Sequence, residues 1–101
     1  GNVLNDMQND SLYLKESTDC SASGNQITNS HKRGIVLDNT TRCRISDNSI
    51  VERREDRLMP VAIEVVGKSN LIQNNALTKG LKGDILCEAG DGKVQGNTVW
   101  D

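Results

Sequence analysis

The stretch that decides the fold is Arg44-Ile45-Ser46-Asp47-Asn48-Ser49-Ile50, in which an Asn lies between two aliphatic residues. An Asn followed two positions later by an aliphatic residue occurs at five regularly spaced places: Asn2/Leu4, Asn25/Ile27, Asn48/Ile50, Asn75/Leu77 and Asn97/Val99. The steps between successive Asn residues are 23, 23, 27 and 22. A period of this length predicts a repeat architecture rather than an ordinary globular core.

Two further series keep the same phase. One is a short segment with apolar residues on either side of a central position: Leu12-Tyr13-Leu14, Ile35-Val36-Leu37, Ile63-Glu64-Val65 and Ile85-Leu86-Cys87. The other lies three residues before each Asn, at Ala22, Ile45, Ile72 and Val94. Each cycle therefore holds three short segments with the period of a strand, and none is long enough for an amphipathic helix. Such a unit buries its apolar side by stacking on its neighbours, as in solenoids.

The composition agrees with thin stacked layers. The 101 residues include 24 Val, Ile and Leu and 11 Asn, but the aromatic residues are Tyr13 and Trp100 alone. The net charge of −2 and the scarcity of aromatic rings argue against a nucleic-acid platform, which needs a basic face and stacking side chains. No apolar run approaches the roughly 18 residues of a membrane helix. We therefore expect neither nucleic acid nor membrane as a partner.

The sequence resembles the repeats of right-handed parallel β-helix proteins. The stretches that carry the resemblance are Gly34-Ile35-Val36-Leu37, Arg44 to Ile50, and Asn70-Leu71-Ile72-Gln73-Asn74-Asn75-Ala76-Leu77. That family includes pectate-lyase-like enzymes, alginate epimerases, phage tailspikes and NosD-type proteins. The resemblance implies an all-β solenoid of about four coils with 22–28 residues each, over residues 1–101 as one domain. It further implies a fragment or small relative of a larger protein, with an extracellular, periplasmic or virion location.

In that family, a stacked Asn in the tight bend between the second and third strands forms a hydrogen-bonded ladder. The residues that fit this structural role are Asn25, Asn48, Asn75 and Asn97. A bend that needs left-handed backbone geometry offers a physical reason for choosing Asn.

Strand alternation predicts which side chains face outward. If Ile35 and Leu37 point inward, Val36 points outward, and the same phase places Tyr13, Glu64 and Leu86 outward. The three apolar members, Tyr13, Val36 and Leu86, then form an exposed stripe that predicts an interface, for example with a second copy. The alternative is that a long loop or another part of a parent chain covers them. The uncapped coil ends are a second route to self-association.

One loop is longer than its equivalents. Twelve residues separate Ile50 from Ile63, where the corresponding gaps hold seven. Three arginines in this loop, Arg53, Arg54 and Arg57, are candidates for binding an acidic sugar. The alternative is a solvated loop whose mixed charges pair with each other.

Three cysteines occur, and two of them are one coil apart. Cys20 and Cys43 each lie five residues before the Asn of their coil, which predicts that they stack at the strand spacing of roughly 4.8 Å. The favoured interpretation is a pair of buried thiols, with a disulfide as the alternative and Cys87 unpaired in both. The chain has no Cys-x-x-Cys and a single histidine, His31, so we expect no metal site and no cofactor.

Carboxylates are the candidate catalysts if the chain acts on a sugar, since paired acids act on glycosidic bonds. The segments Ile35-Val36-Leu37, Ile63-Glu64-Val65 and Ile85-Leu86-Cys87 are the expected first strands of their coils. Glu64 lies on the outward side of its strand, and Asp38 and Asp84 flank the first strands of their own coils. The sequence has no motif typical of polygalacturonases and no Asp-Pro-His-Asp of alginate epimerases. The sequence thus favours a structural or carbohydrate-binding module, with polysaccharide as the expected partner. The alternatives are a polysaccharide lyase, hydrolase or epimerase, and a self-associating protein of unknown role.

Overall fold

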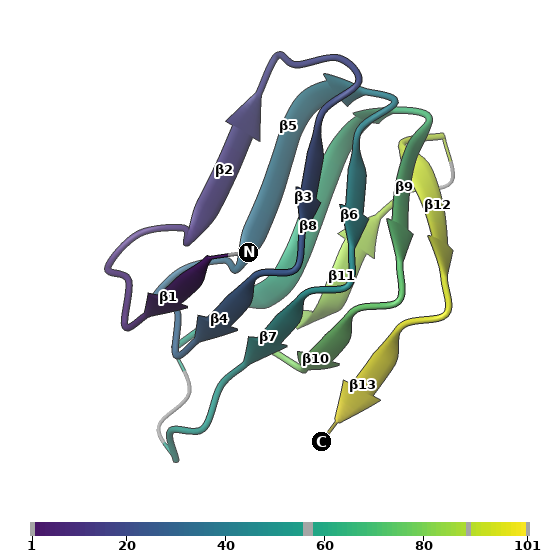
Figure 1. Cartoon of the computed structure of the whole chain (residues 1–101). Helices are drawn as coiled ribbons and strands as arrows, with labels where there is room; N and C mark the ends of the chain where they lie inside the picture. The colour runs from purple at the N-terminus through teal and green to yellow at the C-terminus, as the bar shows by residue number, and fades with distance from the viewer. Residues whose placement is uncertain (1, 56–57, 89, 101) are drawn as a thin grey trace.

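The computed structural model describes residues 2–55, 58–88 and 90–100, and the regular elements in this part of the chain are short strands in three parallel sheets (Figure 1). The first sheet contains β1 (Val3–Asn5), β4 (Gln26–Thr28), β7 (Ser49–Val51), β10 (Ala76–Thr78) and β13 (Thr98–Trp100). The second contains β2 (Leu12–Lys15), β5 (Ile35–Thr41), β8 (Val61–Lys68) and β11 (Gly83–Cys87). The third contains β3 (Ser21–Ser23), β6 (Arg44–Ser46), β9 (Asn70–Gln73) and β12 (Gly92–Gln95).

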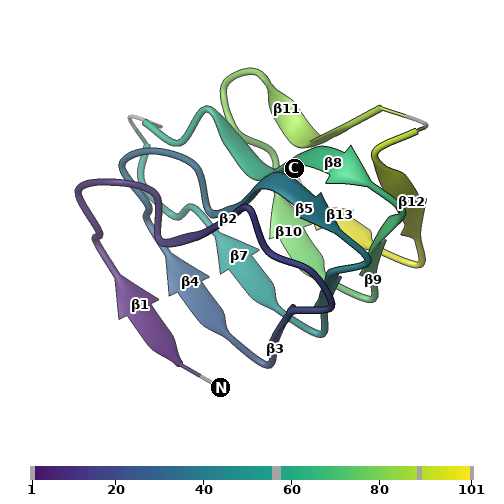
Figure 2. The same cartoon turned by 90° about the horizontal axis from the view of Figure 1, so that it is seen from above.

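The chain visits the second, third and first sheets in turn, so every three strands make one coil. Four coils follow one another as β2-β3-β4, β5-β6-β7, β8-β9-β10 and β11-β12-β13, and β1 precedes them in the first sheet. Seen from above, the coils lie side by side, with β4 between β1 and β7 (Figure 2). This is a parallel β-solenoid of about four turns, and the predicted fold class is confirmed. Among the described residues, no helix has the length and apolar character that crossing a membrane requires.

The register explains the core. Ile35 lies opposite Leu12 on one side and Ile63 on the other, so aliphatic side chains from successive coils form a continuous inward column. Ile27, Ile50 and Leu77 form the corresponding column of the first sheet and are almost completely buried. Burying each such side chain contributes roughly 1.5–3 kcal/mol, which allows a stable stack without aromatic residues.

An asparagine ladder runs along the bend between the third and first sheets. The backbone and side-chain N–H groups of Asn2, Asn25, Asn48 and Asn75 each donate to the side-chain oxygen of the next Asn, at 2.9–3.2 Å, and Asn97 accepts the last pair. The expectation that these Asn residues adopt left-handed geometry is wrong. The positive φ angles, 57–67°, belong to the preceding residues: Gly24, Asp47, Asn74 and Gly96. The ladder Asn is therefore required for its amide, and the turn geometry is supplied by its neighbour.

The bend between the second and third sheets holds a disulfide. Cys20 and Cys43 are bonded, with their Cα atoms 4.5 Å apart, so the interpretation as two buried thiols is wrong. The predicted stacking brings their Cα atoms within the distance that a disulfide spans. Cys20 is only partly buried. Asn70 continues the same column, where its side-chain oxygen accepts the backbone N–H of Cys43 at 2.9 Å. Cys87 is free.

Candidate functional site

The candidate catalytic and interface side chains lie on the outward side of the second sheet, β2-β5-β8-β11. We call this side the first-strand face, because each coil begins with one of these strands. Tyr13, Val36, Glu64 and Leu86 lie opposite one another in successive coils and form one row across it. Tyr13 is 45% exposed and Leu86 43%, whereas Val36 is 2% exposed. The expected continuous apolar stripe is therefore interrupted. Val36 has no surface to offer as an interface residue, and a contact through Tyr13 and Leu86 stays a prediction.

An arginine bridge passes over this row. The Arg33 guanidinium donates to both carboxylate oxygens of Asp10, at 3.0 and 2.9 Å, and to Glu64 at 2.8 Å. It also lies 5.8 Å from the centre of the Tyr13 ring. The bridge thus joins Tyr13 and Glu64, the two neighbours of the buried Val36 in the row.

The bridge keeps Asp10 and Arg33 in their ionised forms. Partial burial by itself raises the pKa of Asp10, but hydrogen bonds from the side chain and backbone N–H of Arg33 outweigh it and hold that pKa below its ordinary value. The same hydrogen bond to Asp10 raises the pKa of Arg33. Both groups therefore stay ionised at neutral pH, and the positive charge of Arg33 is shared by two carboxylates.

The exposed ring of Tyr13 is held in place by its hydroxyl. The Tyr13 hydroxyl donates a hydrogen bond to Asp38, which raises the pKa of the tyrosine. Because Arg33 approaches the ring and Asp38 fixes its tip, the ring is oriented before any ligand arrives. A fixed exposed aromatic ring is a suitable surface for an apolar face of a ligand.

The three candidate catalytic carboxylates each have a partner within the chain. Glu64 pairs with Arg33, Asp38 accepts from Tyr13, and Asp84 accepts the backbone N–H of Ile85 at 2.7 Å. In register, Asp38 lies opposite Val66, one row from Glu64, while Asp84 lies at the start of β11. The structure places Glu64 and Asp38 on the same face and Asp84 near its edge.

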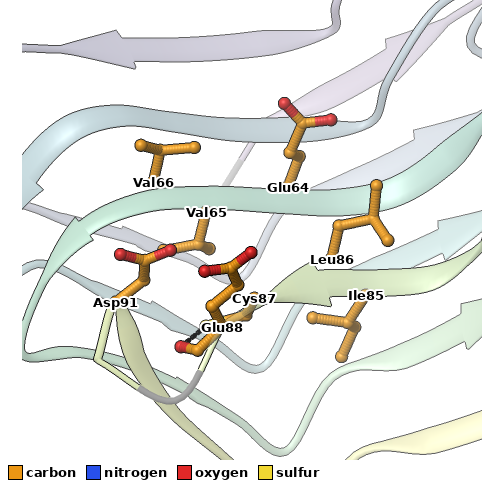
Figure 3. A pocket seen from close by; sticks show the side chains of 8 residues that line it. All are labelled: Glu64, Val65, Val66, Ile85, Leu86, Cys87, Glu88 and Asp91. Atoms are coloured by element: carbon orange, nitrogen blue, oxygen red, sulfur yellow. Dashed lines mark hydrogen bonds between the residues drawn. The ribbon is translucent and has the colours of Figure 1, made fainter.

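A groove of about 540 Å³ lies beside Glu64, where β11 forms the edge of the sheet (Figure 3). Glu64, Val66 and Leu86 point to one side of the sheet, and the carboxylates of Glu88 and Asp91 enter from the turn after β11. The thiol of Cys87 also lines the groove. Its burial and the nearby charge of Asp91 raise its pKa. The groove therefore combines aliphatic walls with three carboxylates.

Metal binding finds no support in these groups. Within residues 2–55, 58–88 and 90–100, no three His, Cys, Asp or Glu side chains are arranged to hold a metal ion. The side chain of His31 is half-buried in the loop between β4 and β5, and its backbone N–H donates to Met7.

The long loop is organised by a buried glutamate rather than by its arginines. The Glu52 side chain is 0% exposed, and its two oxygens accept the backbone N–H groups of Leu58 and Met59 at 2.6 and 2.9 Å. Arg54 pairs with Glu52 at 3.3 Å and donates to the backbone oxygen of Ser30.

Of the three predicted sugar-binding arginines, Arg54 is therefore engaged within the fold. Arg53 is exposed, with its backbone N–H bonded to the side chain of Asn29. Arg57 lies outside the described residues. The expected ion pairing within the loop is present for Arg54, and sugar binding by Arg53 stays a prediction.

Comparison with known families now adds to this geometry. The whole chain, residues 1–101, matches the family model described as the right-handed beta helix region. The chain belongs to the right-handed β-helix family. No curated protein and no solved structure matches it. Because β-helix proteins share spacing rather than a common active site, the function of this β-helix has to be argued from the groups on its faces.

Sequence reasoning missed the residues that organise the two candidate regions. Asp10 and Arg33 are 23 residues apart, the same step as Asn2 to Asn25, so their contact across adjacent coils had a signal in the repeat period. Glu52 had none, because it lies in a run of mixed charges where a solvated position is the ordinary expectation.

Proposed function

We propose that this chain is a β-helix module that binds an extended neutral or amino-sugar oligosaccharide along the first-strand face. The observation that carries the proposal is the combination of an exposed, hydrogen-bonded Tyr13 ring with a groove over β8 and β11 on the same face. Sugar rings present apolar C–H faces to aromatic rings and hydroxyl donors to carboxylates, and both kinds of partner are available here.

The charge of the face supports the choice of ligand class. Glu64, Glu88 and Asp91 line the groove, and Arg33, the cation that pairs with Glu64, is already bonded to two carboxylates. A uronic-acid polymer would bring further negative charge to this site and would be repelled. Hydroxyl and ammonium groups, in contrast, donate hydrogen bonds to carboxylates.

Binding without cleavage is supported by the contacts that already occupy the candidate catalytic carboxylates. A retaining or inverting glycosidase needs one carboxyl group as proton donor and a second as nucleophile or base, and both must reach the glycosidic bond. Glu64 is held by Arg33, and Asp38 is the acceptor for Tyr13. The lyase, hydrolase or epimerase alternative requires these contacts to break when substrate binds.

The test is a glycan array that carries cello-, malto- and chito-oligosaccharides beside oligogalacturonate, followed by a reducing-end assay on whichever glycan binds. The proposal predicts that a neutral or amino-sugar oligosaccharide binds more tightly than oligogalacturonate, with no increase in reducing ends. Selective binding of oligogalacturonate would contradict the proposed ligand class. An increase in reducing ends would transfer the assignment to the enzyme alternative.

A further inference from the structure

The outward side of the third sheet, β3-β6-β9-β12, carries charge of one sign. Its strands lie side by side (Figure 1), and the register places Ser21, Arg44, Leu71 and Lys93 opposite one another in successive coils. We call these four residues the third-sheet row. Arg44 and Lys93 are the charged residues of the four strands, and both are exposed. The row is therefore positive, although the whole chain has a net charge of −2.

Strand alternation is the reason that the row faces outward. Ile45 and Ile72 point into the core and are 0% exposed, so their neighbours Arg44 and Leu71 point away from it. Both residues lie on strands with a hydrogen-bonded strand on either side, and Lys93 continues the row in register with Leu71. The direction of these side chains thus follows from the repeat.

The carboxylates at the bends beside the row are directed elsewhere. Both side-chain oxygens of Asp19 accept hydrogen bonds from the Arg42 guanidinium, at 2.9 and 3.2 Å. The carboxylate of Asp91 lines the groove of the first-strand face (Figure 3). Asp47 lies at the opposite bend, where it lines a separate hollow. None of the three neutralises the row.

Two adjoining hollows run along the third-sheet row and form one trough. The first, of about 390 Å³, is lined by Ser21, Arg44 and Leu71 among others, and the second, of about 380 Å³, by Leu71 and Lys93. Ser69 lines both, as Leu71 does. Within residues 2–55, 58–88 and 90–100, neither Arg44 nor Lys93 forms an ion pair. The trough therefore holds two cations that are available to a ligand.

We propose that the trough binds a linear polysaccharide that carries sulfate- or phosphate-ester groups and lies across the strands of the third sheet. This inference goes beyond the proposed function, because it concerns a different face and a ligand of opposite electrostatic preference. It names one chemical feature, a tetrahedral ester oxyanion, that either ester supplies.

The donors around Arg44 favour such an ester over a carboxylate. The guanidinium offers a fork of N–H groups that pairs with two oxygens of one oxyanion. The exposed hydroxyls of Ser21 and Ser69 line the same hollow and can donate to a further oxygen. A sulfate or phosphate monoester has that further oxygen, whereas a carboxylate and a phosphodiester have only two free oxygens.

The position of Lys93 favours a polymer over a single ion. Two strand spacings separate Arg44 from Lys93, so their Cα atoms are about 10 Å apart, and one oxyanion does not bridge them. Two ester groups on one chain can occupy both cations, with the partly exposed Leu71 beneath the sugar ring between them. An exposed ion pair is weak alone, but two pairs joined by one chain reinforce each other.

The test compares dextran sulfate, dextran phosphate and carboxymethyl dextran at equal degrees of substitution, with unsubstituted dextran as the baseline, by titration calorimetry at low ionic strength. At least one ester should bind about tenfold or more tightly than carboxymethyl dextran, and the two ester arms identify which group is preferred. Carboxymethyl dextran binding as tightly as both esters, or no binding of either ester, would overturn the proposal. So would equally tight binding of an oligodeoxythymidylate of the same charge, whose phosphates are diesters.

Substitutions in the row locate the site. Arg44→Ala and Lys93→Ala should each weaken ester-dextran binding about tenfold, and Arg44→Lys, which keeps the charge without the fork, at least about threefold. Lys82→Ala is the matched control, because it removes an exposed cation from the loop before β11, outside the third sheet, and should change affinity less than about twofold. If Lys82→Ala weakened binding as much as Arg44→Ala, net charge alone would account for binding and the assignment to the trough would be wrong.

The neutral or amino-sugar oligosaccharide of the proposed function separates the two proposals. Its site is on the first-strand face, so its affinity should be the same for the native chain and for Arg44→Ala. Binding of an ester dextran without binding of that oligosaccharide would contradict the proposed function alone. Binding of the oligosaccharide without binding of either ester dextran would contradict the trough alone.

Discussion

The substitution Asn48→Ala removes the middle of the asparagine ladder and should destabilise the fold strongly. The Asn48 side chain takes part in four hydrogen bonds, accepting two from Asn25 and donating to Asn75 and to the backbone oxygen of Ala22. Asn48 is 2% exposed, so water cannot replace these partners. At a net 0.5–1.5 kcal/mol each, with the buried N–H of Asn25 left unpaired, the loss is about 3–5 kcal/mol in the free energy of unfolding.

Urea unfolding followed by circular dichroism, together with a thermal scan, measures this loss. A loss of that size should lower the melting temperature by roughly 12 °C or more in a domain of this length. The matched control is Asn9→Ala, because Asn9 is exposed and its side chain takes no part in the ladder. The control should stay within about 0.5 kcal/mol of the native chain.

The position along the ladder provides a further check. Within the described residues, Asn97 is the last member of the ladder. It is less buried than Asn48 and its side chain takes part in three hydrogen bonds there, so Asn97→Ala should cost less than Asn48→Ala. If Asn48→Ala were no more destabilising than Asn9→Ala, the reasoning that the ladder amide holds adjacent coils together would be refuted.

Three further predictions concern stability. Reducing the Cys20–Cys43 disulfide, which joins residues 23 apart, should lower the free energy of unfolding by about 3 kcal/mol, measured by urea titration with and without dithiothreitol. In Gly34→Ala, the new Cβ would lie 2.4 Å from a backbone oxygen of β8, so this variant should lose about 1–3 kcal/mol in the same titration. The folded pKa of Asp10 lies below its ordinary 3.8, so its pairing with Arg33 stabilises the chain fully above that value and is lost as pH falls through the lower, folded pKa. Asp10→Asn should thus cost about 1–3 kcal/mol at neutral pH and flatten the acid side of the stability profile, and an unchanged profile would argue against the bridge.

The repeat explains why so much of the fold was predictable. A solenoid coil is a local unit, so the period of the Asn residues and the alternation around Ile35 and Leu37 determine both the strands and their stacking. The adjacency of Cys20 and Cys43 followed from the same period. Whether the two sulfurs are bonded did not, because spacing sets the distance between thiols and not their oxidation.

The surface was less predictable, because long polar side chains can reach across several coils. Alternation placed Val36 on the outward side of β5, but Val36 is buried, and Arg33 bonds Asp10 in the preceding coil and Glu64 in the following one. In the same way, Glu52 turned inward to bind backbone N–H groups that only the folded loop presents. Strand period gives the direction of a side chain and says nothing about what covers it.

The central claim, that the first-strand face binds a neutral or amino-sugar oligosaccharide through Tyr13, is tested most directly by titration calorimetry with the best ligand from the array. Tyr13→Ala should weaken binding by about tenfold, the loss expected for one aromatic contact. Trp100→Ala is the matched control, since Trp100 is 49% exposed but lies on β13 in a different sheet, and its affinity should equal that of the native chain. Equal affinities for the native chain and Tyr13→Ala would contradict the claim.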